Sequence, residues 1–467
     1  MSESPRDGAG FIKALGLRDV ILMNVVAVVG MRWIARGART GPESVPLWIL
    51  AWIAFLVPHA VAISSLARKY PEQGGIYAWT RRAFGPGHGF VCGWFLWINN
   101  LFYFPSLLLF GAANFAAIGG EGWQALGSSR WFSVAFVLGG IWLAAGISII
   151  GLRWGKWLQN AGTLGVWIPA GILIGCGALA AVRFGSATPF TVQTMTPGGT
   201  ALDTLALWSA MCFAFSGFEI TGLVGQEVKD PQRTIPIGIV VAGIVTTLVY
   251  IAGSGSVLVA VPVSSLKELS GITDAVQLVA GRVGLTGLAA LTAGLLTVNA
   301  IAGVTSWTAG AARVPFAAGV DAAMPAAFAR LHPRYRTPHV ALVIQSLASS
   351  AIFLASLFVT IAGRASSIQD AYDIMVNLTI LIYFVPYLYS FVAQIRLVPE
   401  APKSLAILGF AATAISMALT FVPPPGSNAL TYEVNVIVQA AIMSAIGGAL
   451  YLWSGRAARR QSPAARQ

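Results

Sequence analysis

The chain has 467 residues, of which 56% are hydrophobic and only 10% are charged, and its formal net charge is +12. A soluble domain carries about 25% charged residues, so this composition excludes a soluble domain of useful size and indicates an integral membrane protein. The positive charge does not indicate nucleic-acid binding, because the basic residues recur in short clusters between apolar runs and no RNA- or DNA-binding motif accompanies them.

Apolar runs follow one another along the whole chain. Each is about 20 residues long, the length that a helix needs to cross the hydrocarbon core of a bilayer. They lie near residues 16–40, 46–67, 90–118, 131–150, 158–182, 204–227, 236–262, 285–312, 338–361, 372–396, 404–422 and 433–454. These runs predict an all-α integral membrane protein with about twelve transmembrane helices.

Lysine and arginine concentrate in alternate connections between the runs, as they do in cytoplasmic loops. The start of the chain is polar and has no cleavable signal pattern. We therefore expect a multi-pass protein of the cell (inner) membrane with both termini in the cytoplasm. The two cytoplasmic tails are expected at residues 1–15 and at residues 455–467, of which the second is basic.

The cysteines indicate no disulfide framework. Cys92, Cys176 and Cys212 lie in or at the ends of apolar runs, where cysteine behaves as a small buried hydrophobic residue. The expected outer loop at 119–130 has no cysteine, so we expect no disulfide-linked accessory subunit there. His59, which follows Pro58 in the second run, is interpreted as a packing residue with satisfied hydrogen bonds.

Two of the runs are interrupted near their centres. The first run carries Val29, Gly30, Met31 and Arg32 at this point, and the sixth carries Phe213-Ala-Phe-Ser-Gly-Phe-Glu219. In hydrocarbon every backbone polar group needs a partner, so an irregular backbone survives only beside a protein-lined cavity. Broken helices of this kind form the midplane substrate sites of secondary transporters.

The two interruptions are five spans apart, which is typical of an inverted repeat of five plus five helices. An odd number of helices per repeat reverses the second copy in the membrane. We therefore expect a first five-helix repeat at 16–182, a second, inverted repeat at 204–396, and a final pair of helices at 404–454.

Three sequence blocks together resemble the amino acid–polyamine–organocation permeases. The blocks run from Tyr70 to Gly85, from Ala214 to Glu219 with Glu227 to Pro236, and from Ser306 through Asp321 and Met324 to Pro338. Within that family the chain looks most similar to the glutamate/GABA-type exchangers, because of the residues Ala311-Ala312-Arg313 and Phe421-Val422-Pro423-Pro424. The resemblance implies a leucine-transporter-type fold with broken first and sixth spans, and a site between spans one, three, six, eight and ten.

The chain departs from the family pattern in two places. Members usually have a Gly-Ser-Gly break in span one whose bare amides bind the substrate carboxylate, whereas the stretch Ala27–Arg32 here has one glycine. Proton-coupled members often carry a lysine in span five, and none occurs near Val166. The second departure makes exchange more plausible than simple proton symport.

Four residues at the interruptions carry the candidate chemistry. Glu219 could meet a substrate ammonium or take up a proton, or it could be a structural carboxylate that accepts bonds from amides freed at the break. Gly217 and Gly30 could be the break points or could allow close helix packing. Arg32 could bind a carboxylate in a bidentate manner, or it could snorkel outward with Arg36 and Arg39.

The remaining candidates are aromatic or polar residues in apolar helices. Phe213 and Trp307 are expected to gate the site, since the family has aromatic gates at similar positions. Thr305 and Ser306 form a possible sodium site or pair with backbone across helices. The wider substrate-binding prediction contains Val29, Met31, Ser216, Phe218, Asn100 and Tyr103, and Asn99 and Asn100 are expected to bond mainly to neighbouring spans.

The sequence thus predicts a secondary active transporter for a small amino acid or related amine, working by alternating access and most plausibly by exchange. The alternatives are a cation-coupled (H⁺ or Na⁺) amino acid or polyamine symporter and a nutrient sensor that does not transport. No enzymatic motif, metal-spaced Cys/His cluster or phosphate loop occurs, so we expect no catalysis, no cofactor and no bound metal. The expected partners are the small-molecule substrate and membrane lipid, without nucleic acid.

Overall fold

The structure is a computed structural model. It describes residues 15–70, 74–196, 202–219, 228–312, 325–358, 360–361, 364–365, 367–423 and 429–461. Several residues named above therefore lie outside the described residues, namely Pro71, Glu72, Gln73, Glu227, Arg313, Asp321, Met324 and Pro424.

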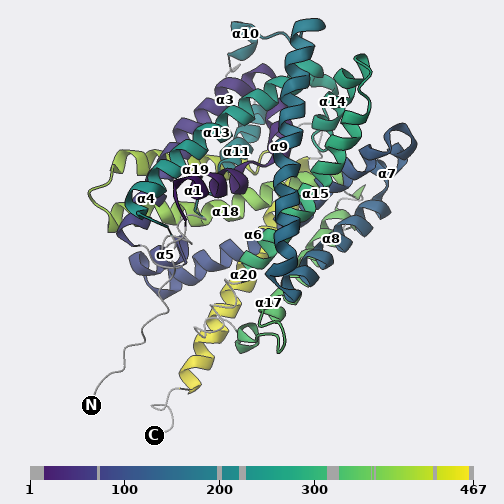
Figure 1. The fold of residues 1–467 in the computed structure, drawn as a ribbon. Coiled ribbons are helices and arrows are strands. Elements are labelled where there is room, and N and C mark those ends of the chain that lie inside the picture. The colour runs from purple at the N-terminus through teal and green to yellow at the C-terminus, as the bar shows by residue number, and fades with distance from the viewer. Residues whose placement is uncertain are drawn as a thin grey trace.

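The described chain is almost entirely helical (Figure 1). Its first half contains α1 (Leu17–Val28), α2 (Met31–Ala38), α3 (Ser44–Ala51), α4 (Val57–Lys69), α5 (Ile76–Phe84), α6 (Pro86–Ile118), α7 (Gln124–Ser128), α8 (Arg130–Ile150), α9 (Leu152–Arg183) and α10 (Val192–Met195). Its second half contains α11 (Leu202–Ala214), α13 (Pro231–Ala260), α14 (Gly271–Arg282), α15 (Gly287–Ala311), α17 (His339–Phe358), α18 (Ile368–Leu397), α19 (Lys403–Leu419) and α20 (Ala429–Gln461).

The other elements are short. A π-helical turn, η2 (Trp52–Leu56), joins α3 to α4 into one long span, and two-residue strands β1 (Thr360–Ile361) and β2 (Arg364–Ala365) pair antiparallel. Single 3₁₀ turns complete the set: η1 (Gly41–Glu43), η3 (Gly120–Trp123), η5 (Val263–Ser265) and η6 (Ala326–Ala329).

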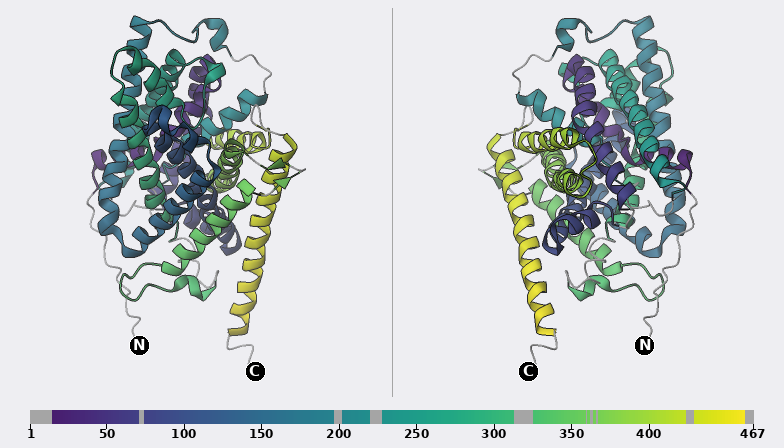
Figure 2. Two further views of the ribbon diagram at one scale, coloured as in Figure 1. Left: turned by 90° about the vertical axis from the view of Figure 1, so that its right-hand side faces the viewer. Right: turned by 90° about the vertical axis from the view of Figure 1, so that its left-hand side faces the viewer.

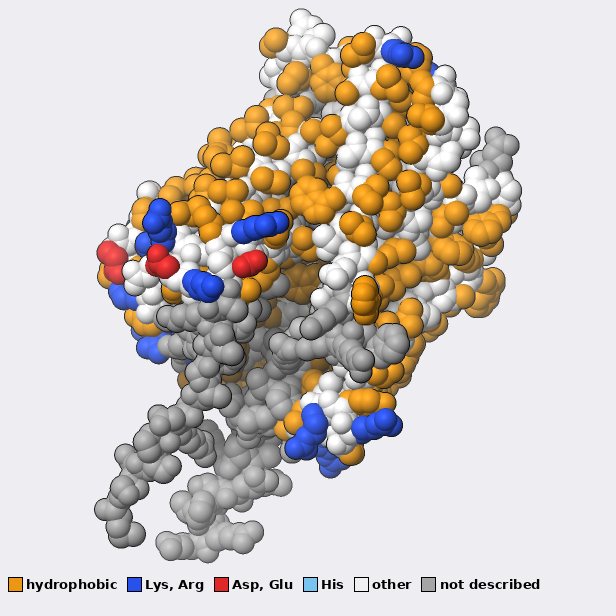
Figure 3. Space-filling model, in the orientation of Figure 1, with side chains coloured by type: hydrophobic (Ala, Val, Ile, Leu, Met, Phe, Trp, Pro, Cys, Tyr) orange, Lys and Arg blue, Asp and Glu red, His pale blue; other side chains and the backbone are white. Residues whose placement is uncertain are grey.

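Nine helices in the described part of the chain are long and apolar enough to cross a membrane, or ten if the bent pair α1 and α2 is one span. Two shorter apolar helices, Thr204–Ala214 and Lys403–Leu419, lie where the sixth and eleventh spans were predicted. Figure 3 shows an apolar surface over the middle of one face, with charged side chains gathered mainly below it. The protein is thus a multi-pass α-helical membrane protein, as the composition indicated, and the exact count of twelve stays a prediction.

The helices around the interruptions pack about α6, which contacts α15 and α18 along much of its length. The bent first span lies against α13, and α15 also packs on α9. In contrast, α20 lies along the outside of the molecule (Figure 2), and only 11% of the residues in its most apolar stretch are buried. The interior of the bundle, rather than its last helix, therefore positions the candidate site.

Helix α14 and the end of α20 are among the features that the sequence did not predict. Helix α14 occupies part of the connection between the seventh and eighth predicted spans and packs on α9 and α15. Its 12 residues are too short to cross a bilayer, so the search for 20-residue apolar runs passed over it. Helix α20 continues to Gln461, into the segment predicted as a tail, because 455–461 contains good helix formers such as Ala and Arg.

Candidate functional site between two broken helices

The first span is broken between α1 and α2. Val29 and Gly30 are extended rather than helical, and the two helix axes differ by 52°. A Cβ atom at Gly30 would lie 2.6 Å from Trp33 Cδ1, so only glycine lets the indole fold back over the break. The interruption predicted at this glycine is therefore present as a real change of direction.

The sixth run is interrupted after α11, which ends at Ala214. A turn follows from Phe215 to Glu219, and Gly217 within it has φ +117°, a conformation that residues with a side chain rarely adopt. A Cβ at Gly217 would also lie 3.3 Å from Val28 Cγ2 and 3.4 Å from the Ala27 carbonyl oxygen. The two interruptions thus lie against one another inside the bundle.

A single hydroxyl group, that of Tyr250 on α13, joins the two breaks. It accepts a hydrogen bond from the Gly30 N–H at 3.1 Å and lies 2.8 Å from the Val28 carbonyl oxygen and 3.0 Å from that of Ala214. Since a hydroxyl carries one proton, it donates to one of these carbonyls at a time. The Tyr250 ring is fully buried and stacks on Trp48.

Glu219 is surrounded by donors. Its Oε1 accepts a hydrogen bond from the Tyr383 hydroxyl, and its Oε2 accepts bonds from the Tyr387 hydroxyl at 2.9 Å and the Gly217 N–H at 3.0 Å. The side chain of His59 brings Nε2 to 3.6 Å from Oε2. The carboxylate therefore accepts a hydrogen bond from a backbone amide at the break, which is the geometry of the structural role considered for Glu219. It also connects the break to α18 through the two tyrosines.

His59 differs from its interpretation as a satisfied packing residue. It does pack, against the rings of Phe55 and Tyr387, and it is fully buried. However, neither of its ring nitrogens has a hydrogen-bond partner among the described residues. The imidazole is thus buried beside a carboxylate with its hydrogen-bonding capacity unused.

A cavity of about 90 Å³ lies between the two breaks. Its lining comes from both breaks and from α6, α15 and α18. The lining residues are Val26, Ala27, Val28, Val29, Gly30, Met31, Arg32, Trp33, Asn99, Asn100, Tyr103, Leu107, Phe110, Phe213, Ala214, Ser216, Gly217, Asn299, Gly303, Trp307 and Tyr383. These helices include those between which the family resemblance expected the site.

Arg32 points into this cavity instead of toward the membrane surface. Its side chain is 1% exposed, so it does not snorkel outward. One guanidinium nitrogen, Nη1, donates to Ser106 Oγ at 2.9 Å, and the guanidinium lies 4.3 Å from the ring centre of Trp33 and 4.6 Å from that of Tyr103. Two aromatic faces and one hydroxyl thus hold this cation at the wall of the cavity.

The two predicted gating residues both line the cavity. The ring centre of Phe213 lies 5.4 Å from that of Trp33 and 5.8 Å from that of Tyr383, both in edge-on contacts. The ring centre of Trp307 lies 6.3 Å from that of Tyr103. Aromatic pairs therefore form two parts of the cavity wall. Whether either ring moves during transport stays a prediction.

Ten of the predicted substrate residues line the cavity: Val29, Gly30, Met31, Arg32, Phe213, Ser216, Gly217, Asn100, Tyr103 and Trp307. Four predicted residues do not. Phe218 is fully buried in the core, and Glu219 is outside the cavity lining but bonds to the Gly217 N–H. The hydroxyls of Thr305 and Ser306 donate to carbonyl oxygens of their own helix, those of Ile301 and Ala302.

Sequence reasoning did not name Trp33, Asn299 or Tyr383 as site residues. Trp33 and Tyr383 look like ordinary aromatic packing in a chain with 15 Trp and 11 Tyr. A polar side chain in an apolar helix is a usable signal, and it would have found Asn299 in the eighth run. Asn100 bonds within its own helix, to the Leu96 carbonyl at 3.0 Å, and not to a neighbouring span as expected.

A buried ion cluster lies further along α2. Arg36, 2% exposed, pairs with Glu268 at 2.6 Å and with Asp373 at 2.9 Å, and Arg39 pairs with Glu268 at 2.6 Å. Burial raises the pKa of the Glu268 carboxyl, but the two arginines outweigh burial and hold that pKa below its ordinary value. The cluster ties α2 to the segment before α14 and to α18.

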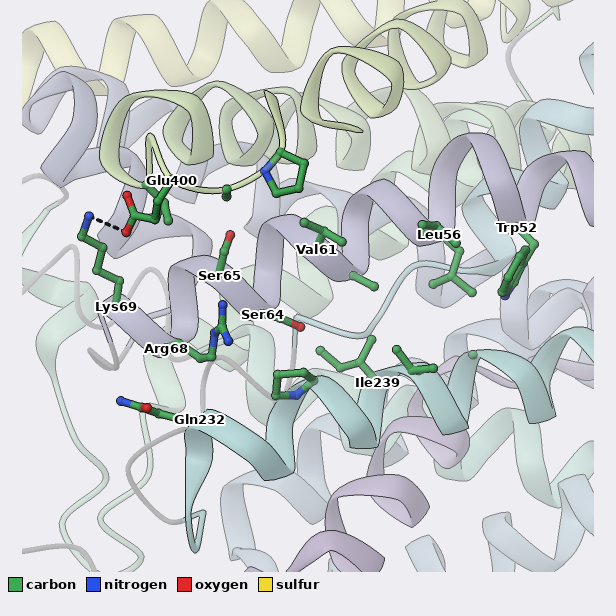
Figure 4. Close-up of a pocket in the computed structure, with 18 residues that line it drawn as sticks. Trp52, Leu56, Val61, Ser64, Ser65, Arg68, Lys69, Gln232, Ile239 and Glu400 are labelled. Atoms are coloured by element: carbon green, nitrogen blue, oxygen red, sulfur yellow. Dashed lines mark hydrogen bonds and ion pairs between the residues drawn. The ribbon is translucent and has the colours of Figure 1, made fainter. Parts of the chain in front are cut away.

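A second, larger cavity of about 540 Å³ lies between η2, α4, α13 and the Val398–Pro402 turn (Figure 4). Arg68, Gln232 and the ion pair of Lys69 with Glu400, at 2.9 Å, lie at one end, and apolar side chains continue to Trp52 at the other. None of its described lining residues has a buried polar atom without a partner. The smaller cavity is therefore the better candidate for a polar substrate.

Comparison with known proteins agrees with this architecture. An uncharacterized transporter of Legionella pneumophila is 26% identical, with 91% of this chain and 94% of the relative covered. A probable agmatine/putrescine antiporter of Lactococcus lactis is 24% identical, over 91% of this chain and 92% of the relative. A glutamate/γ-aminobutyrate antiporter of the same organism is 22% identical, over 86% and 83%.

The profile of one protein family, described as amino acid permease, matches residues 15–446, which include both breaks and every residue that lines the cavity. This match confirms the resemblance drawn from the three sequence blocks. The family and the relatives described above are transporters rather than enzymes. The chain belongs to the amino acid permease family.

Proposed function

We propose that the protein is a secondary active transporter that exchanges a small amino acid or related amine across the cell (inner) membrane by alternating access. The observation that carries the proposal is the cavity between the breaks at Val29–Gly30 and at Phe215–Glu219. Paired half-helices around a midplane cavity are how such transporters bind substrate. Two of the relatives described above are named antiporters, which supports exchange over one-way uptake.

The proposal includes the topology expected from the sequence. Twelve spans would form inverted repeats at 16–182 and 204–396 with a last pair at 404–454, and both termini would face the cytoplasm. The bend between α1 and α2 and the end of α11 at Ala214 support it, since they fall at the first helix of each repeat. Spans one, two, six and seven would rock together against the rest.

Counterflow in proteoliposomes tests the proposal. Vesicles loaded with an unlabelled amino acid should take up the labelled form much faster than empty vesicles, and an imposed pH gradient alone should drive little concentrative uptake. The absence of trans-stimulation for every amino acid and amine tried would overturn exchange. Binding without any flux would indicate the sensor instead.

Proton-coupled uptake is the second candidate, and His59 is the observation that favours it. The imidazole lies 3.6 Å from Glu219 and has both nitrogens free of hydrogen bonds among the described residues. A neutral imidazole has one nitrogen that can accept a proton, so this pair could take up the coupled proton. Strong uptake into empty vesicles under a proton gradient, lost in His59→Leu, would establish this candidate and refute exchange.

A further inference from the structure

Three buried polar atoms around the smaller cavity have no hydrogen-bond partner among the described residues. They are Arg32 Nη2, Asn99 Oδ1 and Asn100 Oδ1. Their side chains are only 1%, 5% and 4% exposed, and all three residues line the cavity. Nearly all buried polar groups in proteins find a partner, so an unpaired set around one cavity indicates that a ligand supplies the missing bonds.

The donor in this set is a cation without a paired anion. No described carboxylate forms an ion pair with Arg32, whose other contacts are the Ser106 hydroxyl and two aromatic faces. Glu219 does not line the cavity, and both of its oxygens already accept hydrogen bonds. A buried cation needs a counter-charge, so the structure calls for an anionic group on the ligand.

The backbone at the first break does not replace Arg32 as the anion site. The Gly30 N–H, which would face a carboxylate in a glycine-rich break, already donates to the Tyr250 hydroxyl. The guanidinium nitrogen Nη2 is therefore the free donor at this side of the cavity, and a guanidinium bonds a carboxylate more strongly than a neutral donor does.

The two acceptors are amide oxygens on consecutive residues of α6. Asn100 is oriented by its own amide nitrogen, which donates to the Leu96 carbonyl at 3.0 Å and leaves Oδ1 unpaired. An ammonium group is a donor only, with three N–H bonds to give. The two amide oxygens can accept hydrogen bonds from an ammonium group. Because these oxygens are neutral, the site does not need a ligand with a net positive charge.

We infer that the transported substrate carries both a carboxylate, bound by Arg32 Nη2, and an ammonium group, bound by the side-chain oxygens of Asn99 and Asn100. The inference rests on the proposed function and narrows it: the substrate class is the amino acids, and amines or diamines without a carboxylate are excluded. A diamine would place a second cation beside Arg32 with no anion to offset either charge, and like charges at close range repel.

Equilibrium binding to the purified full-length protein tests the inference. The probes are the standard amino acids, and for the tightest binder two matched analogues, one without the carboxylate and one without the amino group. For leucine, for example, these are 3-methylbutylamine and 4-methylpentanoate. We expect the analogue without the carboxylate to bind about 10- to 100-fold more weakly, which is what loss of a charge-assisted hydrogen bond produces.

Variants assign each half of the ligand to its residue. Arg32→Gln should weaken the amino acid by a similar factor but should not weaken the analogue without the carboxylate, because that analogue loses only a like charge beside it. Arg32→Lys should fall between, because lysine lacks the planar fork. Asn99→Leu, which keeps the side-chain shape, should weaken both ligands that carry the amino group. Arg68→Gln is the matched control, since Arg68 is an exposed arginine on α4 outside this cavity and should change nothing.

An amine that binds as tightly as its parent amino acid would overturn the inference, as would an Arg32→Gln variant that weakens both ligands equally. Failure of every amino acid to bind would overturn it too. If Arg32→Gln does not fold, the analogue series on the unmodified protein and Asn99→Leu still decide. Binding with the expected pattern but without counterflow would refute exchange while leaving the inferred ligand chemistry intact.

Discussion

Replacing Glu219 with glutamine should separate folding from transport. The carboxylate accepts three hydrogen bonds, from Tyr383, Tyr387 and the Gly217 N–H. In Glu219→Gln all three bonds can persist as neutral bonds if the amide oxygen takes the place of Oε2 and the amide nitrogen donates to the Tyr383 hydroxyl. A bond to a charged acceptor contributes about 1 kcal/mol more than a neutral one, so the substitution costs roughly 3 kcal/mol over the three bonds. Relief of the desolvation penalty of a buried charge, which is of several kcal/mol, acts in the opposite direction.

These two contributions nearly cancel, so Glu219→Gln should shift the thermal unfolding midpoint by only a few degrees. Transport should nevertheless fall sharply or change its pH dependence, because the bonds from α18 to the second break no longer involve a charge. The assay is counterflow measured at several pH values between about pH 5 and pH 8. A well-folded Glu219→Gln variant whose flux matches that of the unmodified protein at every pH would refute the role of Glu219 in transport.

Two further predictions concern the buried contacts away from the cavity. Arg36→Gln leaves the carboxylates of Glu268 and Asp373 buried with too little positive charge, so it should destabilise the folded protein by about 3–5 kcal/mol. A thermal melting curve equal to that of the unmodified protein would contradict the ion cluster. Tyr250→Phe removes the hydroxyl that serves Gly30 N–H and a carbonyl, which should cost about 1–3 kcal/mol for each group left unsatisfied, as a lowered thermal midpoint would reveal. Equal stability of Tyr250→Phe and the unmodified protein would show that the hydroxyl does not join the breaks.

Much of the fold was predictable because its signals are local. The length of an apolar run locates a span, and a glycine inside the run locates a break, as at Gly30 and Gly217. Helix α14 escaped this reasoning since its 12 residues carry no spanning signal. The helical continuation of α20 escaped it as well, because a basic segment after a span reads equally well as a tail.

The candidate site was predictable only where a residue is unusual for its position. Arg32 stands out in an apolar helix, but its neighbours Ser106 and Trp33 do not. The partners of Arg36 are 232 and 337 residues away along the chain, so no local pattern connects them. Glu219 was recognised as a buried carboxylate, yet its tyrosine partners, which look like packing residues from sequence, were not.

The position of Tyr250 has a mechanical consequence. Helix α13 has 30 residues and is thus about 45 Å long, a stiff rod in which one side chain touches both interrupted helices. The hydroxyl accepts a hydrogen bond from the Gly30 N–H of the first break and, when its proton points to the Ala214 carbonyl oxygen, it bonds to the second break at the same time. A tilt or rotation of α13 that keeps both bonds would therefore displace the two halves of the cavity wall together.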